Sequence, residues 1–170
     1  AYTAQELHKL IGEVKTGGDL DQGEYDILEG ALLFQDQRVN SVMVPWEEVV
    51  SVTEEDSIEA IRLMAVESGH SRLPIYSDGN IKGFLHVKDL LRHERESNGS
   101  DLTKYRIREI LIISPEQTLD DLLREMRETQ IHFALVGKSS SEFVGIATLE
   151  DVLEEIVGEI IDESDKISPH

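Results

Sequence analysis

An imperfect internal repeat constrains the fold of this chain more than any local pattern does. Residues 58–90 and 119–152 present the same order of apolar, turn and polar positions, although few positions are identical. A repeat decides the architecture before any single segment does, so we expect two copies of one unit. The polar residues that differ between the copies are the first candidates for function. The matched pairs are Ile58 and Leu119, Ile61 and Leu122, Ala65 and Met126, and Ile75 and Val136 at an offset of 61, then Gly83 and Gly145, and Asp89 and Asp151, at an offset of 62.

Each copy is predicted to run strand, helix, strand, strand, helix. In the first copy a β-branched run at 49–52 predicts a strand, and Ser57 is a suitable N-cap for the helix that follows. Gly69 ends that helix. Asp-Gly-Asn at 78–80 is typical of a hairpin turn, and residues 81–85 form the return strand.

The second copy repeats this order. An apolar run at 110–113 predicts its first strand, and Thr118 with Asp121 opens its helix. A hairpin is expected around the loop at 138–142. A unit of 55–60 residues is small, because it buries only about 60% of its unfolded surface. We therefore expect two copies that bury their sheets face to face.

The predicted fold class is α/β (α+β), with two repeats related by a pseudo-twofold axis. The expected division is a helical lead-in at 1–38, repeats at 39–97 and 102–161, and an acidic tail at 162–170. In the lead-in, Asp21 and Glu24 predict a capping box for a second helix. The lead-in either packs on the repeats or tethers them to an upstream domain. The first helix is predicted from apolar residues with helical spacing, which are Leu7, Leu10, Ile11 and Val14.

The composition excludes several classes of protein. The net charge of −19 argues against nucleic-acid binding, because phosphate contacts need clustered Lys and Arg. The absence of cysteine excludes disulfides and thiolate metal sites. No apolar run approaches the roughly 18–20 residues of a membrane span. The acidic surface is either simply solvated or attracts divalent cations.

Several motifs resemble those of CBS domains, the tandem modules named after cystathionine β-synthase. They are Ser-Arg-Leu-Pro-Ile-Tyr at 71–76 and Gly-Ile-Ala-Thr-Leu-Glu-Asp at 145–151. Further segments resemble the CorC/HlyC group of magnesium and cobalt efflux and hemolysin-like membrane proteins. They are Val-Met-Val-Pro at 42–45, His-Val-Lys-Asp at 86–89 and the acidic run at 148–159.

This resemblance implies a setting as well as a fold. It places a transmembrane domain upstream of Ala1 and a small domain downstream. The chain would then lie on the cytoplasmic face of a membrane and regulate a magnesium or cobalt transport or efflux protein. CBS pairs of this kind commonly form homodimers, and each of their clefts draws on both repeats to bind an adenosine nucleotide. AMP or ATP is the implied ligand, and in so acidic a chain ATP would need Mg²⁺ to offset its charge.

Thr148 and Asp151 can be interpreted without the family. Three residues apart, where a strand becomes a helix, they form a capping box. The same hydroxyl and carboxylate can bind the vicinal diol of a ribose, and the free N–H groups of the helix end favour a nearby anion. The two roles are compatible.

Arg72 is the second candidate binding residue. It is either a phosphate clamp, for which guanidinium geometry is suited, or a strand-edge arginine that faces water. Pro74 stiffens the same strand. Taken with the resemblance, these motifs imply a nucleotide site made of Val44, His70, Ser71, Arg72, Pro74, Ile146, Thr148 and Asp151.

The two copies are unequal at these positions. The first has His86 where a threonine is expected, and the second has His132-Phe133-Ala134-Leu135 in place of Ser-Arg-Leu-Pro. The two intact halves would meet in one cleft and the two altered halves in the other. We therefore predict about one AMP or ATP per chain, with Arg72→Ala weakening binding more than His132→Ala.

Other functions have less support in the sequence. A His86–Asp89 general-base pair lacks a positioned nucleophile or metal, so the chain is not expected to be an enzyme. A purely structural dimerisation module remains the main alternative, with a second copy pairing on the apolar stripe of the last helix. That stripe is Val152, Leu153, Ile156, Val157, Ile160 and Ile161. An acidic cluster could loosely hold Mg²⁺, although a solvated helix face is favoured, because oxygen ligands must converge; it comprises Glu154, Glu155, Glu159, Asp162, Glu163 and Asp165.

Overall fold

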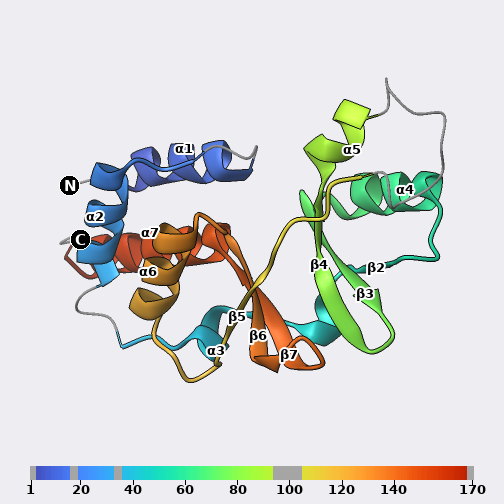
Figure 1. Cartoon of the computed structure of the whole chain (residues 1–170). Helices are drawn as coiled ribbons and strands as arrows, with labels where there is room; N and C mark the ends of the chain where they lie inside the picture. Colours follow the sequence, from blue (N-terminus) through green and yellow to red (C-terminus); the bar gives the residue numbers. More distant parts are fainter. Residues whose placement is uncertain (1–2, 16–18, 33–35, 94–104, 168–170) are drawn as a thin grey trace.

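The chain folds into two similar halves, each with helices and a sheet, preceded by two further helices (Figure 1). The computed structural model describes residues 3–15, 19–32, 36–93 and 105–167. The predicted mixed fold is confirmed. The elements are α1 Ala4–Lys15, α2 Gln22–Leu32, α3 Val39–Val42, β1 Val44–Pro45, the 3-10 turn η1 Trp46–Glu48, β2 Val52–Thr53, α4 Ile58–Ser68, β3 Arg72–Ser77, β4 Asn80–His86, α5 Val87–His93, β5 Leu111–Ile113, α6 Leu119–Thr129, β6 Phe133–Ser139, β7 Glu142–Thr148 and α7 Leu149–Ile167.

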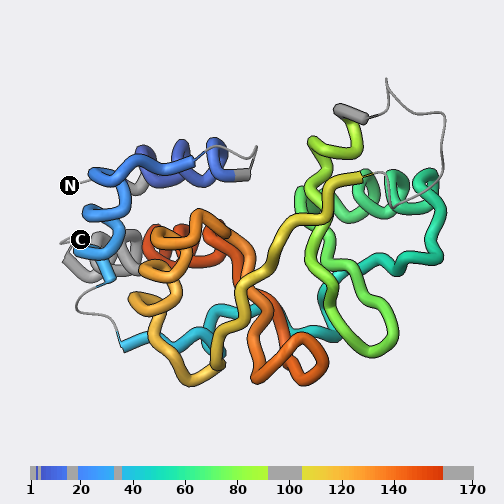
Figure 2. Tube along the Cα trace, in the orientation of Figure 1, coloured from blue at the N-terminus to red at the C-terminus, as the bar shows by residue number. Residues whose placement is uncertain are grey.

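Each half lends a segment to the sheet of the other. One sheet has the order β2-β3-β4 and the other the order β1-β7-β6-β5. Strand β1 belongs to the first repeat in sequence but pairs with β7 of the second, where Val44 lies opposite Ile146. Arg108 belongs to the second repeat in sequence but forms an isolated β-bridge with Phe84 in β4 of the first. Figure 2 shows the segment around residues 105–110 passing from the first half to the second.

Gly83 and Gly145, the glycines that recur in the two repeats, lie where these two segments cross the sheet of the other half. A Cβ at Gly83 would collide with the carbonyl oxygen of Arg108, and a Cβ at Gly145 would collide with that of Val44. Only glycine lets two backbones approach so closely. The glycine match found in the sequence is therefore a packing requirement of the pseudo-twofold pair.

The predicted helix boundaries are confirmed where local chemistry sets them. The backbone N–H of Ala60 donates to Ser57 Oγ at 3.1 Å, and the N–H of Asp121 donates to Thr118 Oγ1 at 3.1 Å. Gly69 ends α4 in the left-handed conformation, with φ of 72°. Each of these caps depends on residues at most four positions apart, which a sequence displays directly.

Two strand boundaries differ from the predictions. The strand predicted at 49–52 is wrong in its first part, because Val49 is the C-cap of η1 and β2 begins only at Val52. The second hairpin is longer than predicted, since β6 runs to Ser139 and β7 starts at Glu142. Each sheet packs mainly on its own helices, and Phe84 meets Phe133 edge-on at 4.8 Å between the two halves.

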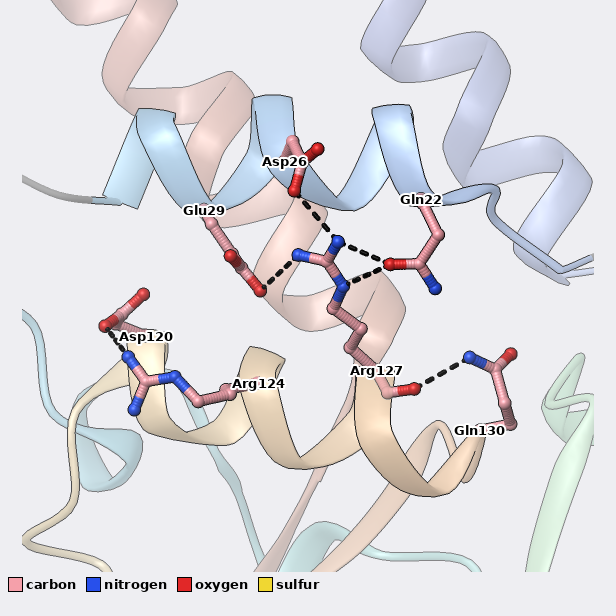
Figure 3. A network of polar contacts seen from close by, with 7 residues as sticks. All are labelled: Gln22, Asp26, Glu29, Asp120, Arg124, Arg127 and Gln130. Carbon is pink, nitrogen blue, oxygen red and sulfur yellow. Dashed lines mark hydrogen bonds and ion pairs between the residues drawn. The ribbon is translucent and has the colours of Figure 1, made fainter.

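The lead-in packs on the second repeat, as one of the two alternatives predicted. Its apolar residues join the core of α6 and α7, and the Asp21–Glu24 capping box forms with distances of 3.0 and 2.8 Å. Arg127 of α6 reaches across to α2 and contacts Gln22, Asp26 and Glu29 (Figure 3).

Within the described ranges, no helix is long and apolar enough to cross a membrane.

The packing of the lead-in shows that the apolar stripe of α7, which was the expected dimer surface, is covered within the chain. Val152, Leu153, Ile156 and Val157 of α7 are buried inside the chain's own core. They cannot pair with a second copy while α1 covers them. The side chains of Ile160 and Ile161 lie outside the described residues.

Candidate functional site

A cavity of about 270 Å³ lies where the two repeats meet. The start of β3 forms one side, and the junction of β7 with α7 forms another. Seven of the eight residues predicted for a nucleotide site line it, namely Val44, His70, Ser71, Arg72, Ile146, Thr148 and Asp151. The structure thus brings residues from both repeats around one space.

Pro74 is not part of the lining. It is buried in β3 opposite Phe84, two residues beyond Arg72. Two strand residues span roughly 6.6 Å, which carries Pro74 away from the mouth of the cavity and into the sheet. The geometry therefore does not support the prediction that Pro74 is a site residue.

Thr148 and Asp151 form the predicted capping box at the start of α7. The N–H of Thr148 donates to Asp151 Oδ2 at 2.9 Å, and the N–H of Asp151 donates to Thr148 Oγ1 at 3.2 Å. The threonine hydroxyl can still donate its own proton, and the second carboxylate oxygen can accept one. Capping therefore leaves both groups able to contact a diol.

Burial raises the pKa of Asp151 to about 6, and the neighbouring Glu154 and Glu150 add to the effect. The hydrogen bonds from Thr148 act in the opposite direction but do not cancel it. A carboxylate with a raised pKa in a cavity is a frequent sign of a functional site. Here its cause is a partly desolvated charge beside other carboxylates.

Arg72 is buried and already has partners. Its guanidinium forms an ion pair with Glu150, and Nη2 donates to the carbonyl oxygen of Val14 in α1 at 3.2 Å. Only 8% of the Arg72 side chain and 9% of the Glu150 side chain are exposed. The interpretation of Arg72 as a water-facing strand-edge residue is therefore wrong. The arginine instead joins the first repeat, the second repeat and the lead-in.

Glu150 is the main residue that the sequence interpretation missed. It lies between Thr148 and Asp151 in the motif. Its position in the first turn of the helix that the motif begins was the one sequence signal that could have indicated a place in the site. Its Oε2 atom is buried and has no hydrogen-bond partner. Together with Glu48, Asp151 and Glu154 it adds carboxylates to a cavity lining that also contains Arg72.

A second cavity, of about 330 Å³, contains the altered positions of both repeats. His86 and His132 line it together with Arg108. His132 Nε2 lies 2.7 Å from the hydroxyl of Tyr25. Burial, with nearby cations, lowers the pKa of His86 to about 4, so the imidazole is neutral at physiological pH.

The general-base pair considered for His86 and Asp89 does not form. Arg108 donates from Nε and Nη2 to the two Asp89 oxygens at 2.8 and 3.0 Å. His86 Nδ1 instead accepts the N–H of Lys88 at 3.2 Å. Within the described part of the chain, no three His, Asp or Glu side chains are arranged to hold a metal ion. The acidic side chains from Glu159 onward fall outside that part.

Comparisons with known proteins agree with this architecture. A family model described as CBS domain matches residues 39–96 and 102–158. The magnesium and cobalt efflux protein CorC of Vibrio cholerae is 33% identical over 167 residues, which cover 95% of this chain and 56% of that protein. The chain thus spans about half the length of this relative.

Two related solved structures contain bound nucleotides. The CBS domain of a bacterial CNNM/CorC family Mg²⁺ transporter in complex with ATP is 29% identical, with a TM-score of 0.63, covering 81% of this chain and 99% of that one. A CBS-domain pair with bound AMP from Klebsiella pneumoniae is 27% identical, also with a TM-score of 0.63, covering 72% and 100%. This chain belongs to the CBS domain family, and its tandem pair is homologous to the corresponding region of the CorC magnesium and cobalt efflux proteins.

Proposed function

We propose that the chain is a regulatory module that binds one adenosine nucleotide in the first cavity. The observation that carries the proposal is the convergence of Arg72 from one repeat with Thr148 and Asp151 from the other. A diol-binding pair and a guanidinium are what a ribose phosphate needs. The nucleotide complexes of the related CBS structures support the same ligand class.

Glu150 supplies the link between binding and regulation in this proposal. Its carboxylate forms an ion pair with Arg72 and so takes the place that a phosphate would take. A bound phosphate competes for the same guanidinium, and Arg72 also holds the carbonyl of Val14. Binding would therefore change how α1 sits on the repeats, and α1 is the segment closest in sequence to the proposed upstream transmembrane domain.

The proposed setting follows the family. We infer that the chain is the cytoplasmic sensor part of a magnesium or cobalt transport protein and that it acts by regulation rather than catalysis. The carboxylates around the cavity favour AMP, or ATP together with Mg²⁺, because a free triphosphate would face their repulsion. A structural dimerisation module without ligand sensing is the alternative, and the dimer itself is compatible with both.

Isothermal titration with AMP, and with ATP in the presence and absence of Mg²⁺, tests the proposal. We expect about one nucleotide per chain, since one cavity holds the complete set of groups. At a ligand concentration of 100 times Kd, the folded state should gain roughly 2.7 kcal/mol in a thermal-shift measurement. No heat and an unchanged Tm would favour the structural alternative, whereas two equal sites would contradict the assignment to one cavity.

A test of Arg72 as the phosphate ligand needs a variant that leaves no unpaired charge in the protein interior, because Arg72 is paired with the buried Glu150. Arg72→Ala alone leaves Glu150 buried without its cation, which is costly. The double variant Arg72→Met with Glu150→Gln removes both charges, and we expect it to weaken AMP binding at least about tenfold, the equivalent of 1.4 kcal/mol. Glu154→Gln, in the same cavity, and His132→Ala, in the other, are the controls. Equal affinity of the double variant and the controls would exclude Arg72 as the phosphate ligand.

A further inference from the structure

Arg108 occupies, by pseudo-symmetry, the place that Val44 holds at the first cavity. Val44 lies opposite Ile146 of β7, and Arg108 lies opposite Phe84 of β4. Phe84 and Ile146 differ by 62 positions, the same offset as Gly83 and Gly145. Both segments also approach a repeat glycine closely enough to exclude any side chain there. The two positions are thus equivalent, although one is apolar and the other is cationic.

The side chain of Arg108 reaches the carboxylate that corresponds to Asp151. That carboxylate is Asp89, which is only 4% exposed at its side chain, and both of its oxygens accept from Arg108. Asp151, in contrast, uses one oxygen for capping and has no arginine on it. A bidentate arginine pair is the strongest common contact that a carboxylate makes, so Asp89 is not available to a diol.

We propose that Arg108 closes the second cavity to nucleotides and thereby makes this CBS pair a one-site module. One residue has two effects: it replaces the apolar wall that Val44 provides, and it masks the carboxylate that would bind a ribose. The replacement of threonine by His86 then removes the hydroxyl as well. The inference rests on the proposed nucleotide binding and adds the reason why binding is confined to one cavity.

The test restores the residue types of the first cavity in the second. Arg108→Val with His86→Thr is expected to raise the AMP stoichiometry from about one to about two in isothermal titration. The new site should be about tenfold weaker than the first, because the second copy has His132 and Phe133 in place of Ser71 and Arg72. His86→Thr alone should leave the stoichiometry at one. Amide hydrogen exchange should show new AMP protection around residues 84–89 in the double variant only.

Arg108→Lys covers the risk that Arg108→Val fails to fold. Lysine keeps a positive charge beside Asp89 but cannot donate to both oxygens, so Arg108→Lys with His86→Thr should admit a second, weaker AMP. A stoichiometry of one in every folded variant that lacks Arg108 would overturn the proposal, as would a second site in His86→Thr alone. If the unmodified chain binds no AMP at all, the proposed function fails instead, which separates the two outcomes.

Discussion

Asp151 shows how a binding role and stability oppose each other at a single residue. Its carboxylate caps α7 and lines the cavity, yet burial raises its pKa from 3.8 to about 6. The folded protein therefore holds the Asp151 proton more tightly than the unfolded chain does. The stabilising contribution of the protonated form is fully present below about pH 3.8 and is lost as the pH rises through about 6.

Asp151→Asn is expected to stabilise the ligand-free protein at pH 8 and to weaken AMP binding. The amide oxygen can still accept the N–H of Thr148, while the cost of the buried charge disappears. A gain of roughly 1–2 kcal/mol follows from the shift, discounted for partial access to water. Chemical denaturation at pH 8 and pH 5 measures it, because at pH 5 the carboxyl group is largely protonated in the folded state and the gain should shrink.

Asp121→Asn is the matched control for this change. Asp121 occupies the same position in α6, three residues after the capping Thr118, but its side chain is 41% exposed. Its replacement should alter stability little at either pH. An equal gain from both variants, or a gain from Asp151→Asn that does not depend on pH, would contradict the assignment of the cost to a buried charge.

At the scale of elements, one arginine makes several polar contacts between α6 and α2, beside the apolar core that the two helices share. Arg127 donates from Nε to Gln22 at 2.7 Å and pairs with Asp26 at 2.9 Å and Glu29 at 3.0 Å, as Figure 3 shows. Its guanidinium also lies 5.7 Å from the centre of the Tyr25 ring. These contacts fix the lead-in on the second repeat from one side, while Arg72 holds α1 from the other.

Arg127→Ala is expected to increase amide hydrogen exchange in α2 with little effect on β3 and β4. Three acceptors on α2 lose their common donor, so local opening of the helix becomes easier. Arg124→Ala is the control, because Arg124 pairs within its own helix, with Asp120 (Figure 3) and with Asp121. If both variants change the exchange of α2 equally, Arg127 does not hold the lead-in.

For the whole molecule, the two halves differ in what covers their helices. The lead-in covers α6 and α7, whereas α4 and α5 of the first half present exposed apolar side chains. Leu63, Val66 and Leu91 are 57%, 80% and 60% exposed. Leu63 and Val66 lie three residues apart on α4 and therefore share a face. Because exposed apolar faces are typical of association surfaces, we propose that two copies of the chain associate through α4 and α5 rather than through the buried stripe of α7.

Val66→Glu should lower the fraction of dimer measured by analytical ultracentrifugation, since a charge would be buried in the contact. Val144→Glu is the control, because Val144 is also exposed, at 48%, but lies on β7 of the other half. A monomer in the unmodified protein, or equal dissociation by both variants, would rule out this surface.

The sequence alone determined the repeat, the order of elements and half of the residues that line the cavity. These features rest on local signals: Ser57, Gly69 and Thr118 act within four residues, and the repeated glycines recur at a constant offset. Tertiary structure alone decided the partners of the charged side chains. Arg72 meets Glu150 and Val14 across 78 and 58 positions, and Arg108 reaches Asp89 only because its segment crosses Gly83. Such pairs depend on which backbones cross and how closely, and no spacing along the chain encodes that geometry.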